Sequence, residues 1–128
     1  MKEYDIAVIG GGPAGMMAAI AAGKTSDVIL LEKNSSLGRK LLLTGGGRCN
    51  ITNNKPIKKL LNSFDNKNFL KHSFYTLPNE KLLSFFQENG LDFIEEDDNR
   101  IFPQTEKSLD VLNVLKDNLD DVVISYNY

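Results

Sequence analysis

A glycine-rich segment near the start of the chain has the spacing of a phosphate-binding turn. Gly10-Gly11-Gly12-Pro13-Ala14-Gly15 fits the pattern G-x-G-x-x-G. The first glycine of this pattern allows a tight turn, Gly12 leaves room for a pyrophosphate, and Gly15 lets the next helix pack closely on the preceding strand. Backbone N–H groups and the helix dipole at the start of that helix then favour an anion.

An acidic residue follows this turn at the distance that dinucleotide binding requires. Glu32 lies 22 residues after Gly10, at the end of a second apolar run. A carboxylate there can accept hydrogen bonds from an adenosine ribose and would repel a 2′-phosphate. The turn alone is a weak signal, but its context predicts an adenine-dinucleotide site.

A second phosphate motif is suggested by Gly23-Lys24-Thr25, which copies the end of the P-loop pattern G-x-x-x-x-G-K-[ST]. The position that must be glycine in that pattern is Ala18. Gly23 also follows an expected helix, whereas a P-loop joins a strand to a helix. The sequence therefore argues against a nucleoside triphosphatase.

The elements around the first turn form one βαβ unit in residues 1–32. Tyr4–Ile9 is an apolar run that predicts a central parallel strand buried on both faces. Pro13 suits the first turn of a helix, Ala14 to Ala22 continue it, and Gly23 is the expected C-terminal cap. Val28 to Leu31 predict the second strand.

The rest of the chain alternates polar loops with short periodic segments. Residues 33–56 are rich in Gly, Ser, Thr and Asn and predict a long functional loop, and residues 57–74 predict a weakly helical, solvated stretch. The further expected elements are a helix at 79–89, a hairpin with strands 92–94 and 100–102 around an acidic turn, a helix capped by Ser108 and reaching Leu119, and a strand at 122–125.

The loop at residues 37–53 is the most unusual segment in composition. Three successive glycines, Gly45 to Gly47, allow backbone to pass close to a flat ligand. Arg39, Lys40 and Arg48 can offset pyrophosphate charge, and Thr44 and Asn50 can bind polar edges. On composition alone, an exposed flexible loop explains the segment equally well.

The run LGRKLLLTGGGRCNITN, together with the first glycine turn and Glu32-Lys33, resembles the BaiN-like (YhiN-like) family of NAD(P)/FAD-dependent oxidoreductases. The segments NRIFP at 99–103 and SLDVL at 108–112 continue the likeness, which covers essentially the whole chain. It implies an α/β, Rossmann-like FAD-binding fold of the glutathione-reductase type. The parallel sheet would have strand order 3-2-1, with a mainly helical insertion at 57–119, a small β-hairpin, and a third strand at 122–126.

The resemblance also implies a set of cofactor-binding residues and a redox role. FAD would bind in an extended form, with NAD(P)H as co-substrate and an unknown organic substrate. No catalytic residue is assigned. The residues implied along FAD, from its pyrophosphate and ribose toward its flavin, are Gly10, Gly12, Pro13, Ala14, Gly15, Glu32, Lys33, Arg39, Lys40, Thr44, Gly45, Gly46, Gly47, Arg48, Cys49 and Asn50.

Family members are much longer than 128 residues, so we expect this chain to be the N-terminal part of an FAD-binding domain, inactive by itself. A truncated, non-catalytic adenine-dinucleotide-binding module is the alternative. An NAD site is also compatible with the first turn, because both cofactors share the ADP moiety. About 90 residues between the second and third strands favour the FAD type.

Composition narrows the other possibilities. Fifteen basic and 17 acidic residues give no summed positive field, so nucleic acid is not an expected partner. The apolar run from Ala14 to Ala22 is shorter than the roughly 18 to 20 residues of a membrane span. The single cysteine suits a reducing cytosol, so a cytoplasmic protein is expected. No Cys/His cluster suggests a metal.

Three features invite a catalytic interpretation that their surroundings do not support. Cys49 has no C-x-x-C partner and is expected to be a buried structural thiol. His72 lies among lysines and asparagines, which suggests an exposed surface residue. Glu95 to Asp98 are expected to fill a solvated turn rather than to bind a metal.

Overall fold

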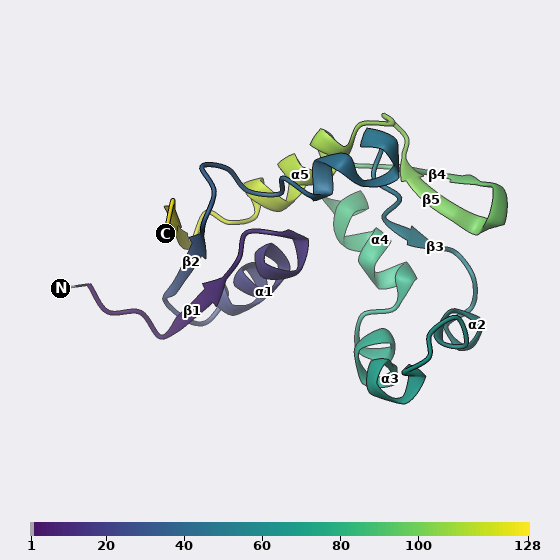
Figure 1. Ribbon diagram of the computed structural model, residues 1–128, viewed down its shortest axis with the longest axis horizontal. Helices are drawn as coiled ribbons and strands as arrows, with labels where there is room; N and C mark the ends of the chain where they lie inside the picture. The colour runs from purple at the N-terminus through teal and green to yellow at the C-terminus, as the bar shows by residue number, and fades with distance from the viewer. Residues whose placement is uncertain (1) are drawn as a thin grey trace.

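A parallel three-stranded sheet carries the start and the end of the chain in the computed structural model, which describes residues 2–128. It contains β1 (Ile6–Ile9), β2 (Val28–Glu32) and β6 (Val122–Tyr126), in the order β1-β2-β6. Both neighbouring pairs are parallel, with Val8 opposite Leu30 and Leu30 opposite Ile124. The predicted order 3-2-1 is confirmed, and Figure 1 shows helix α1 beside these strands.

Helix α1 (Pro13–Gly23) connects β1 to β2 and packs on the sheet. Proline at its first position suits a helix start because no intrahelical partner exists there for an N–H. Met16 and Ala19 are fully buried. Gly23 is not the cap that the sequence predicted, because the helix includes it and is capped by Lys24. A Cβ at Gly23 would lie 3.3 Å from Cγ2 of Val122, so its small size serves packing against β6.

Strand β1 is an edge strand, so the prediction that it is buried on both faces is wrong for this chain. Ile6 is 38% exposed and Ile9 is 79% exposed, whereas Val28 and Leu30 of β2 are 1% and 0% exposed. The reason lies in the strand order, because only β2 is paired on both sides. A run of apolar residues reports a buried strand but not its place in a sheet.

A second, antiparallel sheet contains β3 (Thr52–Asn53), β5 (Arg100–Pro103) and β4 (Phe93–Glu96), in that order. The predicted hairpin is confirmed, but its turn is shorter than expected. Glu95 and Glu96 belong to β4, and only Asp97–Asn99 form the turn, as the 3-10 segment η2. Strand β3 was not predicted, since two residues carry no periodicity that a sequence pattern can detect.

Residues 2–128 contain four further α-helices: α2 (Ile57–Leu61), α3 (Lys67–Thr76), α4 (Asn79–Glu88) and α5 (Ser108–Asp117). Figure 1 shows α2 and α3 at the end of the molecule away from β1 and β2. Helix α3 buries none of its side chains completely. Helix α4 is attached to the second sheet by Nδ2 of Asn79, which donates to the carbonyl oxygens of Asn53 (2.8 Å) and Lys55 (3.1 Å).

Helix α5 joins the two sheets through one continuous core. Its apolar stripe, Val111, Leu112, Val114 and Leu115, is buried in the same cluster as Leu30. Ser108 does not cap α5 as predicted, because the N-cap residue is Lys107. The Ser108 hydroxyl instead donates to the carbonyl oxygen of Leu42 at 3.0 Å and fixes the loop after β2.

That loop is more ordered than the sequence predicted. It contains the 3-10 segment η1 (Leu41–Gly47) as well as β3. None of the helices within residues 2–128 is both long and apolar enough to cross a membrane. The same part of the chain has no group of three or more His, Cys, Asp and Glu side chains that could hold a metal ion.

Replacing Leu30 by alanine should show how strongly the core supports the parallel sheet. Its side chain is fully buried in β2, so we expect Leu30→Ala to lower the free energy of unfolding by about 2 to 5 kcal/mol. Ile9→Ala, in the exposed neighbour strand, should change it by only about 0.5 kcal/mol. Urea unfolding followed by circular dichroism measures both, and equal losses would contradict this account.

Candidate cofactor site

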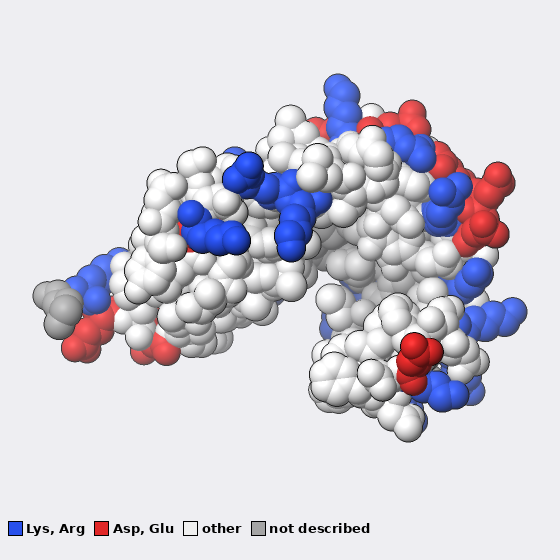
Figure 2. Space-filling view, viewed as in Figure 1, with Lys and Arg blue, Asp and Glu red and all other residues white. Residues whose placement is uncertain are grey.

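A pocket of about 360 Å³ lies where β1 and β2 end, at the carboxyl edge of the parallel sheet. This edge is where α/β folds bind their ligands. Seven predicted cofactor-binding residues line the pocket, and Figure 2 shows lysine and arginine side chains gathered over the same part of the surface. These seven are Gly10, Gly12, Pro13, Glu32, Lys33, Arg39 and Lys40.

The glycine turn has the backbone geometry that its motif predicted. Gly10 has a φ of +98°, which favours glycine, and its N–H donates to the carbonyl oxygen of Leu31 at 2.8 Å. A Cβ on Gly15 would lie 1.9 Å from the carbonyl oxygen of Gly10, so no other residue fits there. A Cβ on Gly12 would meet nothing within 4 Å.

The open space beside Gly12 is where a pyrophosphate would approach the backbone. The first N–H groups of α1 have no partner within the helix and are oriented toward its N-terminal side. With Lys33, Arg39 and Lys40 around the same pocket, positive charge and backbone donors are combined. This arrangement fits the diphosphate of a dinucleotide.

Glu32 organises this pocket through both of its carboxylate oxygens. Oε2 accepts a hydrogen bond from the Gly11 N–H at 2.7 Å, and Oε1 accepts from the N–H (2.7 Å) and the Nδ2 (2.6 Å) of Asn34. The side chain is buried, with the residue only 6% exposed. The N–H groups of Asn34 and Gly11 hold the pKa of Glu32 below its ordinary value, so the carboxylate is the stable form.

The segment after β2 is held against the glycine turn by a second group of bonds. The Gly38 N–H donates to the carbonyl oxygen of Gly11 at 2.8 Å, and Nη1 of Arg39 donates to Oδ1 of Asn34 at 3.0 Å. Gly38 has a φ of +68°, and a Cβ there would lie 2.5 Å from Cδ1 of Leu112. The positions of Arg39 and Lys40, which follow Gly38 and line the pocket, therefore depend on how α5 packs.

The other nine predicted residues do not line this pocket. Ala14 and Gly15 lie in α1 behind the turn. Thr44 to Asn50 form the end of η1 and the residues after it, where Thr44 Oγ1 donates to the Leu41 carbonyl (2.7 Å) and the Cys49 N–H to the Thr44 carbonyl (2.9 Å). Their contact with a flavin stays a prediction.

This second glycine segment is folded tightly on the antiparallel sheet. Gly45, Gly46 and Gly47 all have positive φ. A Cβ on Gly45 would lie 2.7 Å from the Asn50 nitrogen and 3.0 Å from Cε1 of Phe102, while one on Gly46 would meet nothing within 4 Å. One glycine is thus required by packing, and the next leaves an open backbone surface.

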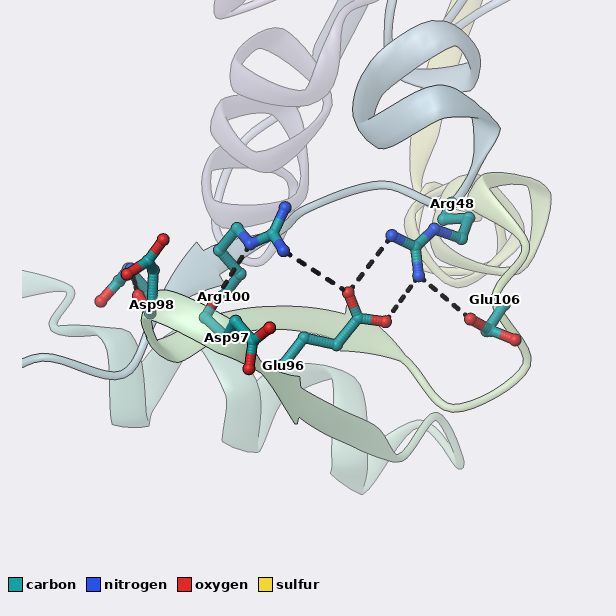
Figure 3. A network of polar contacts seen from close by, with 7 residues as sticks. Arg48, Glu96, Asp97, Asp98, Arg100 and Glu106 are labelled. Carbon is teal, nitrogen blue, oxygen red and sulfur yellow. Dashed lines mark hydrogen bonds and ion pairs between the residues drawn. The ribbon is translucent and has the colours of Figure 1, made fainter.

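Arg48 joins this segment to the second sheet rather than to the pocket (Figure 3). Its guanidinium binds Glu96 through two hydrogen bonds, of 2.6 and 3.3 Å, and Glu106 through one of 3.0 Å. It also lies over the Phe102 ring, 4.0 Å from the centroid. Arg48 holds the pKa of Glu96 below its ordinary value. Arg48 was predicted to offset the charge of a pyrophosphate, but its guanidinium pairs here with the carboxylates of Glu96 and Glu106.

The remaining residues considered from the sequence are placed as follows. Cys49 is a free thiol whose pKa is raised by burial, which confirms the prediction that it is buried. His72 is exposed on α3. Glu96 pairs with arginine, so the acidic segment is not simply a solvated turn.

Sequence reasoning missed several pocket residues that a closer use of the strand order would have found. Asn34 and Ser36 follow β2 directly, and Tyr128 follows β6, the strand next to it. Since parallel strands end at the same edge, residues just after β6 belong beside those after β2. Gly11, between the two motif glycines, was also not predicted. The structure requires glycine there, because a Cβ would lie 2.3 Å from Cδ2 of Leu37 and 2.9 Å from Oε2 of Glu32.

With this geometry in place, comparison with known proteins identifies the family. A family model described as HI0933-like protein Rossmann domain matches residues 4–128. The chain belongs to this family. This match confirms the resemblance to BaiN-like oxidoreductases. The relatives support a flavin-dependent oxidoreductase family in general terms.

Two relatives and one solved structure show how far the HI0933-like likeness extends. The 3-dehydro-bile acid delta(4,6)-reductase of Clostridium scindens is 35% identical over 117 residues, covering 87% of this chain and 27% of that protein. The ribosomal RNA dihydrouridine synthase of Haemophilus influenzae is 29% identical over 122 residues, covering 94% of this chain and 30% of that protein. The crystal structure of Thermovibrio ammonificans THI4 shares the fold, with a TM-score of 0.59 and 14% identity over 96% of this chain and 38% of that one.

The role of Glu32 predicts how stability depends on pH. Because its folded-state pKa is lowered, it stabilises the fold above its ordinary value of 4.5, and this contribution is lost as pH falls through the folded pKa. Glu32→Gln should flatten the loss of stability as pH is lowered from neutrality through 4.5 and below. Unfolding curves across this range test it, and an unchanged slope would show that Glu32 is not the responsible group.

The Arg48 contacts predict that the second glycine segment is fixed by electrostatics and stacking. Arg48→Gln should lower the urea midpoint and speed hydrogen exchange at residues 44–50, because it removes the Glu96 pair and the Phe102 contact. Arg39→Gln, at an exposed arginine with a single neutral partner, is the matched control. Equal effects of the two changes would contradict this role.

Proposed function

We propose that this chain binds FAD and forms part of an FAD-dependent oxidoreductase that exchanges hydride between NAD(P)H, the flavin and an organic substrate. The observation that carries the proposal is the pocket at the sheet edge, where Gly12 leaves open space beside cationic side chains and the Glu32 carboxylate. The family supports the same class of protein.

The pocket residues divide the adenosine diphosphate half of FAD among themselves. The turn from Gly10 to Gly15 would receive the pyrophosphate, with Lys33, Arg39 and Lys40 offsetting its charge. Glu32 retains acceptor capacity on its oxygens for a ribose hydroxyl. Because its carboxylate is already fixed by Gly11 and Asn34, it would bind the ribose without reorienting.

The second glycine segment would lie on the flavin side of the cofactor. Gly46 offers an open backbone surface, and Arg48 holds the segment in place through Glu96 and Glu106. Bound FAD would supply the hydride chemistry through its isoalloxazine ring. The residues of this chain bind and orient the cofactor, and none of them is assigned to a proton transfer.

The relatives favour reduction as the direction of the reaction. One is named a delta(4,6)-reductase and the other a dihydrouridine synthase, and both names describe addition of hydrogen across a carbon–carbon double bond. The chain spans less than a third of either protein. We therefore extend to this chain the reaction class, a double-bond reduction, and leave the substrate of the whole protein to experiment.

FAD binding tests the proposal directly. The purified chain, titrated with FAD, should quench flavin fluorescence, and ADP should compete because the pocket holds the shared half of the ligand. Gly12→Ala should weaken FAD binding about tenfold or more, since its Cβ enters the space left for the pyrophosphate. The backbone at Gly12 is extended, with a φ of −77°, so the variant should fold normally.

The matched control is Asn113→Ala, at an exposed position of α5 away from the pocket. It should bind FAD like the parent chain. FAD binding that survives Gly12→Ala, or that ADP does not displace, would overturn the assignment of this pocket. Tight NAD binding with none of FAD would favour the alternative dinucleotide.

A further inference from the structure

A second concave surface lies on the helical pair α2–α3, far from the cofactor pocket in Figure 1. Its volume is about 320 Å³. Lysine, asparagine, leucine and tyrosine side chains line it, and none of the acidic residues among 2–128 does. The lining residues are Lys58, Leu61, Asn62, Lys67, Asn68, Lys71 and Tyr75. We call this surface the α2–α3 groove.

The two helices beside the groove have little apolar packing of their own. In α2 only Leu61 is buried, and α3 buries none of its side chains completely. Phe64 contacts Phe74 edge to face, with the ring centroids 5.5 Å apart, yet Phe64 stays 45% exposed. A helix in a protein gains most of its stability by packing one face against a partner. A third helix seated in the groove would supply that packing.

The residues that reach the groove from α3 are evenly spaced. Lys67, Lys71 and Tyr75 follow one another at intervals of four, which places them on one face of the helix. Because an α-helix rises about 1.5 Å per residue, neighbours in this row are separated by about 6 Å along the helix axis. Side chains at i, i+4 and i+8 of a second helix have the same spacing. Two carboxylates followed by an apolar side chain on that helix would match the two lysines and the tyrosine.

The charge around the groove is unusual for this chain. Residues 55–76 contain five lysines and one aspartate, while the other 106 residues contain ten basic and 16 acidic side chains. Figure 2 shows basic side chains along this lobe with little acidic surface between them. None of the ion pairs found within residues 2–128 involves Lys58, Lys67 or Lys71. Three like charges therefore share a concavity without internal compensation, and the groove is complementary to an acidic partner.

We propose that the α2–α3 groove docks an acidic amphipathic helix of a partner protein. Carboxylates at i and i+4 of that helix would pair with Lys67 and Lys71, and a third carboxylate would pair with Lys58 from α2. An apolar side chain at i+8 would pack on the Tyr75 ring, which is 50% exposed. A concave surface between two helices suits an inserted third helix better than it suits a flat anionic membrane.

The expected affinity follows from the exposure of these groups. Solvent-exposed ion pairs contribute little individually, so the Tyr75 contact and the charge pairs must act together. We therefore expect a Kd in the micromolar range that weakens as salt screens the charges. This inference goes beyond the proposed function, because the groove shares no residue with the cofactor pocket. Helix docking is measured without FAD, so docking and cofactor binding succeed or fail separately.

Fluorescence anisotropy with a labelled peptide of four Glu-Ala-Ala-Leu repeats tests the groove, because this peptide carries carboxylates at every i+4 position beside a row of leucines. The triple variant Lys58→Gln, Lys67→Gln, Lys71→Gln should bind the peptide at least about tenfold more weakly than the parent chain. All three lysines are exposed, so the fold should persist. Circular dichroism of the variant checks this.

The matched control changes three other exposed lysines, Lys24, Lys107 and Lys116, to glutamine. It alters the net charge equally and should bind the peptide within about twofold of the parent. Tyr75→Ala should weaken binding about fivefold or more, and Tyr75→Phe, which keeps the ring, by less than about twofold.

A charge swap separates docking in the groove from general attraction between opposite charges. The double variant Lys67→Glu, Lys71→Glu should lose the acidic peptide and gain binding to a peptide of four Lys-Ala-Ala-Leu repeats, which the parent chain should not bind. Glutamate in the first turns of α3 is also compatible with the helix dipole.

Several outcomes would overturn the proposal. They are no binding of the acidic peptide by the parent chain, equal loss in both triple variants, an intact affinity after Tyr75→Ala, or no gain from the charge swap. Displacement of the peptide by inorganic polyphosphate with no contribution from Tyr75 would show a general polyanion surface. Tighter binding to phosphatidylserine vesicles than to the peptide would assign the groove to a membrane instead.

Discussion

The contact between the Glu32 carboxylate and the Gly11 N–H is the interaction on which the cofactor pocket depends. It joins the end of β2 to the middle of the glycine turn, at 2.7 Å and out of solvent. The same carboxylate accepts hydrogen bonds from the backbone N–H and the Nδ2 of Asn34, and Oδ1 of Asn34 in turn accepts one from Arg39. One buried charge thus fixes the turn, the start of the next loop and one of its cations.

This arrangement is possible because small residues occupy the closest approaches. Gly15 lets α1 touch the carbonyl of Gly10, and Gly38 lets the loop pass against Leu112 of α5. Both contacts exclude a Cβ, but they differ in range along the chain. The first is local to the βαβ unit, whereas the second links residues separated by more than seventy positions and couples the pocket to the helix that joins the two sheets.

The residues of the second glycine segment, 44–50, differ in their contacts. Arg48 and Cys49 serve the fold, one through Glu96, Glu106 and Phe102 and the other by burial. At Gly46, in contrast, a Cβ would meet nothing within 4 Å. All residues of this segment were predicted to contact the cofactor, but some of them hold the segment on the second sheet. These contacts keep the remaining backbone in a defined position.

The sequence alone determined the βαβ unit and the glycine turn with Glu32, because these depend on short-range spacing and on a motif with strict steric requirements. The strand order, which pairs β2 with a strand about 90 residues away, came from the family resemblance. The sequence also placed α4, α5 and the hairpin from their apolar periodicity. Only the tertiary structure decided that β1 lies at an edge, that Ser108 binds Leu42 instead of capping α5, and that Arg48 pairs with Glu96. Those outcomes depend on which segments, distant in the sequence, come into contact. Neither the charge of a residue nor the pattern of its neighbours indicates which distant residue it will bind.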